Sequence, residues 1–194
     1  IGKGDRLQKV TAIEDQSTLF DFQYNLNGSI AHYQASDADG YEAQQLQFTY
    51  DAGSRMTAVI HDVNLEKQYK LFYNNSSDRV LKQQYSGGSV QESTLYIKSL
   101  SGNPLVQIKK SNSVKDTLYM VYGPIGIVSF VKNNETYFTL KDHLGSVRVI
   151  MDANANAIAA YEYDVYGNVT VVAQPETDFF PYLFTSQEYD YELG

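Results

Sequence analysis

Short runs of alternating apolar and polar residues, separated by clusters of Gly, Asn, Asp and Ser, extend along most of this 194-residue chain. Apolar side chains recur at every second position, as at Val147, Val149 and Met151, which are therefore expected to form the buried face of one strand. A period of two predicts β-strands, and the polar clusters predict tight turns between them. The one helical stretch that the pattern allows is a brief coil from Glu42 to Gln47.

A tyrosine followed by Asp or Asn marks an internal repeat. The clearest copies are "FQYNLNGSIAHY" from Phe22, "FTYDAGSRMTAVI" from Phe48, "LFYNNSSDRVLKQQY" from Leu71 and "YEYDVYGNVTVVA" from Tyr161. Each copy predicts a β-hairpin, and a single hairpin cannot bury its apolar face alone. Neighbouring hairpins must therefore pair edge to edge, which predicts an all-β fold in which repeated hairpins form a curved, spiralling antiparallel sheet.

The composition agrees with this fold and excludes several functions. There are 17 Tyr and 9 Phe, residues that suit a pleated surface, and there is no Cys, which excludes disulfides, zinc thiolate sites and cysteine nucleophiles. The net charge of −8 argues against a nucleic-acid partner, because phosphate neutralisation requires clustered Lys and Arg. No apolar run approaches the length of a membrane helix, so no membrane span is expected.

The stretch "KDHLGSVRVIMD", from Lys141 to Asp152, gathers side chains suited to acid–base chemistry around a glycine. Asp142, His143 and Asp152 could act as acids or bases, and Ser146 as a nucleophile. The members of most catalytic sites converge from distant segments, and a regular strand would point Asp142 and His143 to opposite sides. We therefore expect Asp142 and Gly145 to form a turn and Arg148 to pair with a carboxylate; a hydrolase centred on His143 is the alternative.

No metal or cofactor is expected. "DADG", at 37–40, faintly resembles a calcium loop, but the only following acid, Glu42, is at the wrong position for a ligand. His32 and His61 have no second ligand at metal-binding spacing, so each is interpreted as an ordinary strand or surface histidine. Five Asn-X-Ser/Thr sequons occur, and in an Asn-rich turn protein we interpret them as turn sequences.

These residues resemble the YD-repeat or Rhs proteins, which are related to the C components of insecticidal Tc toxins and to the shell of teneurins. "YDAGSRMT", from Tyr50, is similar to the repeat consensus, with Ser54 inserted between Gly53 and Arg55. The stretch from Tyr137 to Gly194 is similar to the start of the Rhs-associated core region. Residues 1–136 are thus expected to hold the repeats, and residues 137–194 the start of the core region, continuous with the same sheet.

The resemblance implies a spiral of hairpins that builds a hollow cocoon around a C-terminal toxin or effector polypeptide. The implied partners are that polypeptide and the neighbouring repeats, and the implied location is secreted or on the surface of a bacterium. Two departures stand out: Ser186 occupies a position where the family usually has Gly, and no Asp-Pro pair occurs, so the autoprotease activity of some relatives is expected to be absent.

The expected function is therefore structural and non-enzymatic. The alternative is an adhesin or recognition module that binds a protein or glycan through a Tyr-rich face, because Tyr suits both stacking and protein contact. The residues expected to form the structural motif are Tyr50, Asp51, Gly53 and Arg55 in one repeat turn, Asp142, His143, Gly145 and Arg148 in the core turn, and Tyr163, Asp164 and Gly167 in the last repeat.

Overall fold

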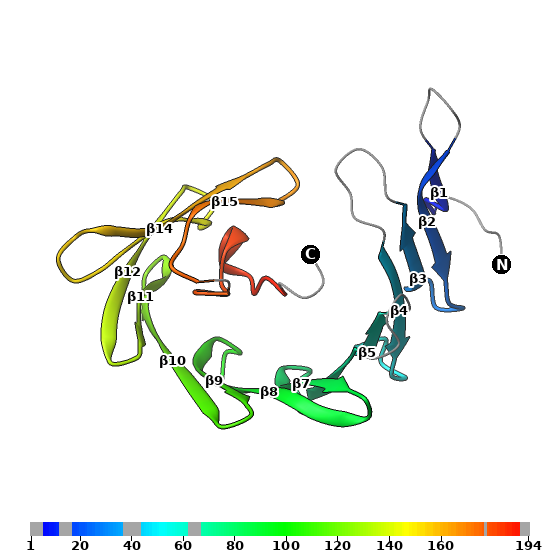
Figure 1. Ribbon diagram of the computed structural model, residues 1–194, viewed down its shortest axis with the longest axis horizontal. Coiled ribbons are helices and arrows are strands. Elements are labelled where there is room, and N and C mark those ends of the chain that lie inside the picture. Colours follow the sequence, from blue (N-terminus) through cyan, green and yellow to red (C-terminus); the bar gives the residue numbers. More distant parts are fainter. Residues whose placement is uncertain (1–5, 12–16, 37–43, 62–66, 177, 191–194) are drawn as a thin grey trace. The chain divides into compact units, whose positions relative to one another are not determined.

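The computed structural model describes residues 6–11, 17–36, 44–61, 67–176 and 178–190. Within these residues the chain is all-β, and its strands follow one another in sequence order in a single sheet, as an antiparallel meander without a crossover (Figure 1). The prediction of an all-β fold made of successive antiparallel hairpins is thus confirmed. The strands are β1 Lys9–Thr11, β2 Thr18–Tyr24, β3 Ile30–Ala35, β4 Gln44–Tyr50, β5 Met56–His61, β6 Gln68–Tyr73, β7 Arg79–Ser86, β8 Ser89–Lys98, β9 Pro104–Ser111, β10 Val114–Gly123, β11 Gly126–Lys132, β12 Glu135–Lys141, β13 Val147–Met151, β14 Ala157–Tyr163 and β15 Val169–Ala173.

The chain forms two compact units. The first comprises residues 1–96 and 109–114, and the second residues 97–108 and 115–194. In the first unit, buried side chains come from the middle of successive strands, as with Leu46 of β4, Val59 of β5 and Leu71 of β6. This core is thin, because a single sheet supplies it.

The second unit has the larger core, because a C-terminal segment covers one face of its sheet. Strand β10 shows the alternation: Leu118 and Met120 are buried, whereas Tyr119 and Val121 are 52% and 47% exposed. On the buried face, Phe130 of β11 and Ile150 of β13 pack with Phe180 from the C-terminal segment. That segment, red in Figure 1, contains one short 3-10 turn, η2 Phe184–Ser186. The sheet alone would leave this apolar face in water.

The boundary expected between residues 136 and 137 falls inside β12. This strand pairs with β11 through Glu135 to Phe138 and with β13 through Phe138 to Lys141. Hydrogen bonding therefore continues from one side of that boundary to the other. No helix in the described residues is long and apolar enough to cross a bilayer.

The brief coil expected from Glu42 to Gln47 is wrong where the structure describes it. Residues 44–47 belong to strand β4, and residues 42 and 43 lie outside the described residues. Leu46 pairs with Tyr33 on one side and His61 on the other, and its side chain is 4% exposed. The local helix preference of Gln is overridden, because a strand here completes two ladders and buries Leu46.

The buried face expected from Val147, Val149 and Met151 is also wrong in part. Val147 and Ile150 are fully buried, whereas Val149 and Met151 are half-buried. The register between β12 and β13 shifts at this point, since Lys141 pairs with Val147 but Leu140 pairs with Val149. Such a bulge inserts one residue and reverses the alternation beyond it. A strict period of two therefore predicted the wrong face for the second half of β13.

We predict that Phe180→Ala lowers the free energy of unfolding by about 3–5 kcal/mol, because a fully buried ring is replaced by a cavity. Phe138→Ala is the matched control on the same unit, because Phe138 is 43% exposed and loses far less burial. Urea denaturation followed by circular dichroism measures both. Equal shifts for the two variants would show that the C-terminal segment does not complete the core.

Candidate functional site

The repeat turn at Asp51 is a five-residue loop closed by its first side chain. Asp51 Oδ1 accepts hydrogen bonds from the N–H groups of Gly53 (2.9 Å) and Arg55 (3.0 Å). The backbone closes the same loop: Ser54 N–H donates to Asp51 O, and Asp51 N–H donates to Arg55 O. An Asx side chain that satisfies the N–H groups two and four positions ahead fixes such a turn without help from the rest of the protein.

This loop, which we call the Asx turn, recurs along the chain. It begins at Asn25, Asp51, Asn74, Asp142, Asp152 and Asp164, and in each case Oδ1 accepts the N–H groups two and four positions later. The fourth position always has a positive φ, occupied by Gly28, Ser54, Ser77, Gly145, Ala155 and Gly167. A related turn begins at Ser99 and has Gly102 at its fourth position.

The fourth position of the Asp51 turn is occupied by Ser54 and not by Gly53. Ser54 has φ = 60°, whereas Gly53, one residue earlier, lies outside the left-handed region. The glycine quoted as part of the repeat consensus is therefore not the residue that adopts the left-handed conformation. Ser carries a steric cost in this conformation that Gly does not.

Each repeat tyrosine reaches back to the turn of the preceding hairpin. Tyr50 Oη donates to the carbonyl of Ile30 (2.7 Å), and Tyr73 Oη donates to that of Met56 (2.7 Å). The acceptors are the first residues of β3 and β5, directly after the previous Asx turns. Tyr122 and Tyr163 make the same bond to Pro104 (2.8 Å) and Val147 (2.7 Å), the first residues of β9 and β13, and Tyr24 donates to Leu7 (2.6 Å), two residues before β1. We call this bond the tyrosine anchor.

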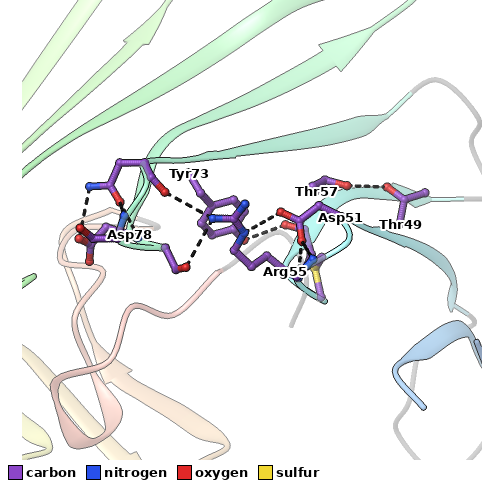
Figure 2. Close-up of polar contacts among 11 residues, drawn as sticks. Thr49, Asp51, Arg55, Thr57, Tyr73 and Asp78 are labelled. Atoms are coloured by element: carbon purple, nitrogen blue, oxygen red, sulfur yellow. Dashed lines mark hydrogen bonds and ion pairs between the residues drawn. The ribbon is translucent and has the colours of Figure 1, made fainter. Parts of the chain in front are cut away.

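Arg55 links one turn to the next within the first unit (Figure 2). Its Nε donates to Asp51 Oδ2 at 2.6 Å, and its guanidinium lies over the Tyr73 ring, 5.4 Å from the centroid. The same guanidinium is within 3.4 Å of Asn74 O and Ser77 Oγ in the following turn. Asp, Arg and Tyr therefore form a continuous contact from one hairpin to its neighbour.

The core turn at Asp142 repeats this arrangement within the second unit. Arg148 Nε and Nη2 donate to Asp142 Oδ2 at 2.9 and 2.8 Å, and the guanidinium lies 5.0 Å from the Tyr163 ring centroid. The carboxylate that pairs with Arg148 is thus Asp142 itself. Lys141 occupies the position before the Asx, where the turns at Asn25, Asp51, Asn74 and Asp164 have Tyr. Its Nζ lies 3.4 Å from the carbonyl of Ile125. Here a lysine ammonium replaces the tyrosine hydroxyl as the anchor.

The last turn of this kind, at Asp164, lacks an arginine. Asp164 Oδ2 instead accepts a bond from Asn168 Nδ2 at 2.6 Å. Gly167 has φ = 92°, and a Cβ there would lie 2.7 Å from the Phe184 ring. Only glycine meets both demands at this position. Phe184 also contacts Tyr163, with ring centroids 5.5 Å apart, so the turn also receives the C-terminal segment.

The turn electrostatics favour ionised carboxylates and neutral tyrosines. The N–H of Arg55 and its guanidinium hold the pKa of Asp51 below its ordinary value. At Asp142, partial burial opposes ionisation, but the N–H of Ser146 and the guanidinium of Arg148 outweigh it and lower the pKa. Hydrogen bonds from Asn168 lower the pKa of Asp164. Burial raises the pKa of Tyr122 to about 12 and raises that of Tyr163 further. Lowered carboxyl pKa values mean that the turns gain stability above the ordinary Asp pKa and lose it on acidification.

The acids and the histidine of "KDHLGSVRVIMD" do not converge. Asp142 and Asp152 begin two separate Asx turns, at opposite ends of β13. His143 is exposed at the second position of its turn, and none of the bonds of Asp142 goes to it. Ser146 is fully buried, and its Oγ accepts the N–H of Thr185. In the described residues the bond of Ser146 Oγ goes to the backbone of Thr185 and not to His143 or an acid, so these side chains do not form a nucleophile–base pair.

Metal-binding geometry is also missing from the part of the chain that the structure describes. No group of three or more His, Asp or Glu side chains there could hold an ion. His32 and His61 lie in strands β3 and β5, and the His61 ring contacts Tyr69 edge to face, 5.8 Å between centroids. The "DADG" segment at 37–40 and Glu42 lie outside the described residues.

Sequence reasoning missed the polar residues that tie the C-terminal segment to the core turn. Ser186 Oγ donates to the carbonyl of Gly145 at 2.8 Å and accepts a bond from Lys141 Nζ, also at 2.8 Å. Ser186 has φ = 58°, the conformation that the family's usual glycine would adopt freely. The position of Lys141 directly before an Asx turn was the available signal for an anchor; nothing in the sequence pointed to its contact with Ser186.

Together these features define a class of protein: a β-sheet of successive hairpins in which Asx turns and tyrosine anchors repeat. Comparison with known proteins identifies the family. The model of the "Teneurin YD-shell" family matches residues 4–194, so the chain belongs to this family. The resemblance drawn from "YDAGSRMT" and the core region is confirmed.

Individual relatives come from both animals and bacteria. The chain is 30% identical over 151 residues, 73% of its length, to Salivary gland surface protein 1 of Aedes aegypti, and 26% identical along its whole length to the tRNA3(Ser)-specific nuclease WapA of Bacillus spizizenii. It spans 4% and 8% of these proteins. The crystal structure of TcdB2-TccC3 matches 90% of the chain and 8% of its own, with a TM-score of 0.50 and 14% identity, which shows a shared fold.

We predict that Tyr73→Phe lowers the free energy of unfolding by about 0.5–1.5 kcal/mol, because Met56 O loses its hydrogen-bond donor while the ring remains. Tyr119→Phe is the control, since this tyrosine is 52% exposed and makes no anchor. Denaturant unfolding measures both variants. The same midpoint in both would contradict a stabilising role for the anchor.

We predict that Gly145→Ala lowers the free energy of unfolding by about 1–2 kcal/mol, through backbone strain alone. Gly145 has φ = 84°, and an added Cβ would meet nothing within 4 Å. Gly53→Ala, at an exposed turn position outside the left-handed region, would place a Cβ 3.3 Å from Asp51 Oδ1, a contact that a small shift of this exposed turn relieves, so it should cost less stability than Gly145→Ala. A larger loss for Gly53→Ala than for Gly145→Ala would overturn the assignment of the fourth position.

Proposed function

We propose that this chain is a non-enzymatic segment of a YD-shell wall that encloses a C-terminal toxin or effector polypeptide. The observation that carries the proposal is the tyrosine anchor, by which Tyr24, Tyr50, Tyr73, Tyr122 and Tyr163 each bond to a carbonyl at or just before the start of the preceding strand. Membership of the YD-shell family supports a structural role. Tyr50, Asp51, Arg55, Asp142 and Arg148 then serve as structural residues of the wall.

The anchors suit a wall because they add stiffness where a meander is weakest. Backbone ladders hold neighbouring strands together along their length, but hairpin ends are free to fray. An anchor and an Arg–Tyr contact at the turn, such as Tyr163 with Arg148, fix that end to the previous hairpin. A wall that must keep a polypeptide inside benefits from closed hairpin ends more than a surface that only binds does.

The partners of this function are the enclosed polypeptide and the neighbouring repeats. One relative is by name a nuclease, and this chain aligns with 8% of it, so the chain corresponds to a small part of a larger protein there. We infer a secreted or cell-surface location, in a bacterial toxin of the polymorphic kind. The mosquito relative shows that matching sequences also occur outside bacteria.

A second candidate is a recognition module that binds a protein or glycan. Apolar residues of the second unit, among them Tyr119, Val121, Phe138 and Leu140, are between 43% and 52% exposed on strands β10 and β12. Exposed aromatic and aliphatic side chains of this kind suit a partner surface. The name of one relative, Salivary gland surface protein 1, favours the same reading. Several large aromatic rings of this unit are nevertheless buried, among them Phe130, Tyr161 and Phe180.

Protease protection of the enclosed polypeptide tests the proposed function. The complete gene product that contains this chain is digested, and the survival time of the polypeptide downstream of the shell is measured. We expect the wild type to protect it, and the triple variant Tyr50→Phe, Tyr73→Phe, Tyr163→Phe to shorten its survival, because three anchors of about 1 kcal/mol each are removed. Tyr119→Phe is the control.

Two outcomes would contradict enclosure. In one, the downstream polypeptide is digested as fast in the wild type as after denaturation. In the other, Phe138→Ser abolishes attachment of the intact protein to a cell or glycan surface while protection is absent in all forms, which would favour the recognition module.

A further inference from the structure

Residues 178–190, which we call the C-terminal lid, lie on the buried face of the second unit much as a bound peptide would. Phe180 stacks on Phe130, with centroids 4.3 Å apart and planes at 17°, and Phe179 meets Tyr137 edge to face at 5.1 Å. Phe180 and Leu183 are fully buried. Apart from the short η2 turn, the lid has little regular structure, so its position depends on these contacts.

A charged anchor holds the start of the lid. Lys132 of β11 has a side chain only 7% exposed, and its Nζ donates to Glu176 Oε1 at 2.8 Å and to Phe179 O at 3.1 Å. Its ammonium also lies 3.4 Å from Asp116 Oδ2 and 5.1 Å from the Phe179 ring centroid. A buried ammonium needs such partners, since an uncompensated buried charge is strongly destabilising. The Lys132 ammonium therefore favours a polypeptide segment in which a carboxylate lies three residues before a pair of aromatic residues.

A strained clip holds the middle of the lid. Thr185 and Ser186 are consecutive non-glycine residues with φ of 47° and 58°. They are kept there by the core turn: Thr185 N–H donates to Ser146 Oγ at 3.0 Å, and Ser186 Oγ donates to Gly145 O at 2.8 Å. Backbone held in a sparsely populated conformation persists only while its surroundings fix it, and such positions concentrate at switches. Because release of the lid relieves this backbone strain, the clip lowers the free energy that release requires.

We propose that the face formed by Phe130, Tyr137, Val147 and Ile150, with Lys132 at its end, is a binding site for an extended polypeptide segment with an acid followed by paired aromatics. In this structure the chain's own lid occupies the site. The identification of the competing occupant as a segment of the enclosed polypeptide rests on the proposed function; the site and its preference rest on the contacts above. The lid is then displaced by a segment that satisfies Lys132 and fills the Phe180 position.

The contacts favour this occupant over a small ligand. The lid reaches the sheet through ring stacking, main-chain bonds such as Val147 N–H to Leu183 O (3.1 Å), and one carboxylate. Only a polypeptide presents rings, carbonyls and an acid at these spacings. A competing peptide binds only to molecules in which the lid is open, so its apparent affinity is the intrinsic affinity multiplied by the open fraction. Loosening the lid raises that fraction and should therefore tighten binding of an added peptide.

The test uses the full 194-residue chain and a fluorescent peptide with the sequence of residues 174–190, in an anisotropy titration. Glu176→Gln in the chain removes the charge that faces Lys132 and keeps the shape of the side chain. Ser186→Ala removes the hydroxyl that bonds to Gly145 O and so loosens the clip. We expect each variant to bind the peptide about two- to fivefold more tightly than the wild type, the range of a partly exposed ion pair. Glu162→Gln, an exposed acid on β14, is the matched control and should leave binding unchanged.

Two further measurements make the result specific. Amide hydrogen exchange at Leu183, Gln187 and Tyr189 should accelerate by a similar factor in Glu176→Gln and not in Glu162→Gln. A peptide with alanine in place of its second phenylalanine should bind at least about tenfold more weakly. Equal binding by Glu176→Gln and Glu162→Gln, or equal binding of a scrambled peptide, would overturn the proposal. Protease protection is measured separately, so a failure of enclosure and a failure of this site are distinguishable.

Discussion

The hydrogen bond from a tyrosine hydroxyl to the first carbonyl of an earlier strand is the interaction on which the repeat depends. It demands a donor at the end of a long, rigid side chain, because the acceptor is a backbone carbonyl at the start of the neighbouring strand, as from Tyr73 of β6 to Met56 of β5. It also demands that the acceptor turn have a fixed shape, which the Asx side chain supplies. Tyrosine and Asx are therefore adjacent in sequence for two separate reasons. The Asx side chain closes its own turn, and the tyrosine hydroxyl holds the turn of the previous hairpin.

The two units use this shared device with different supporting structure. In the first unit the hairpins have a thin core, and the Arg55 contact with Tyr73 and Asn74 reinforces the link between turns. In the second unit the lid covers one face, and the anchor before the core turn is Lys141 instead of tyrosine. The ammonium can serve both Ile125 O and Ser186 Oγ, whereas a phenol has a single proton to donate. The replacement fits a turn that must also hold the lid.

The sequence was sufficient to predict the hairpins, the strand order and the turns that begin with Asx, because these follow from local period and turn chemistry. It was insufficient wherever a residue acts at a distance. The bulge that buries Ile150 instead of Val149 depends on the partner strand, and β4 forms because two neighbours pair with it. The left-handed backbone conformation is adopted by Ser54 and not by Gly53, because the position within the turn, and not the residue type, decides which φ is required.

The same constraint explains why an acid, an imidazole and a hydroxyl in the core turn do not hydrogen-bond to one another through their side chains. A general base needs a free lone pair close to the proton that it removes. In the core turn, both carboxylate oxygens of Asp142 already accept hydrogen bonds, Oδ1 from backbone N–H groups and Oδ2 from Arg148. Ser146 Oγ accepts a hydrogen bond from the N–H of Thr185. The polar atoms that close the turn or hold the lid are therefore already engaged in hydrogen bonds within the protein. Residue types that suggest catalysis are here the types that satisfy buried or strained backbone, and His143, which makes no such bond, is left exposed in solvent.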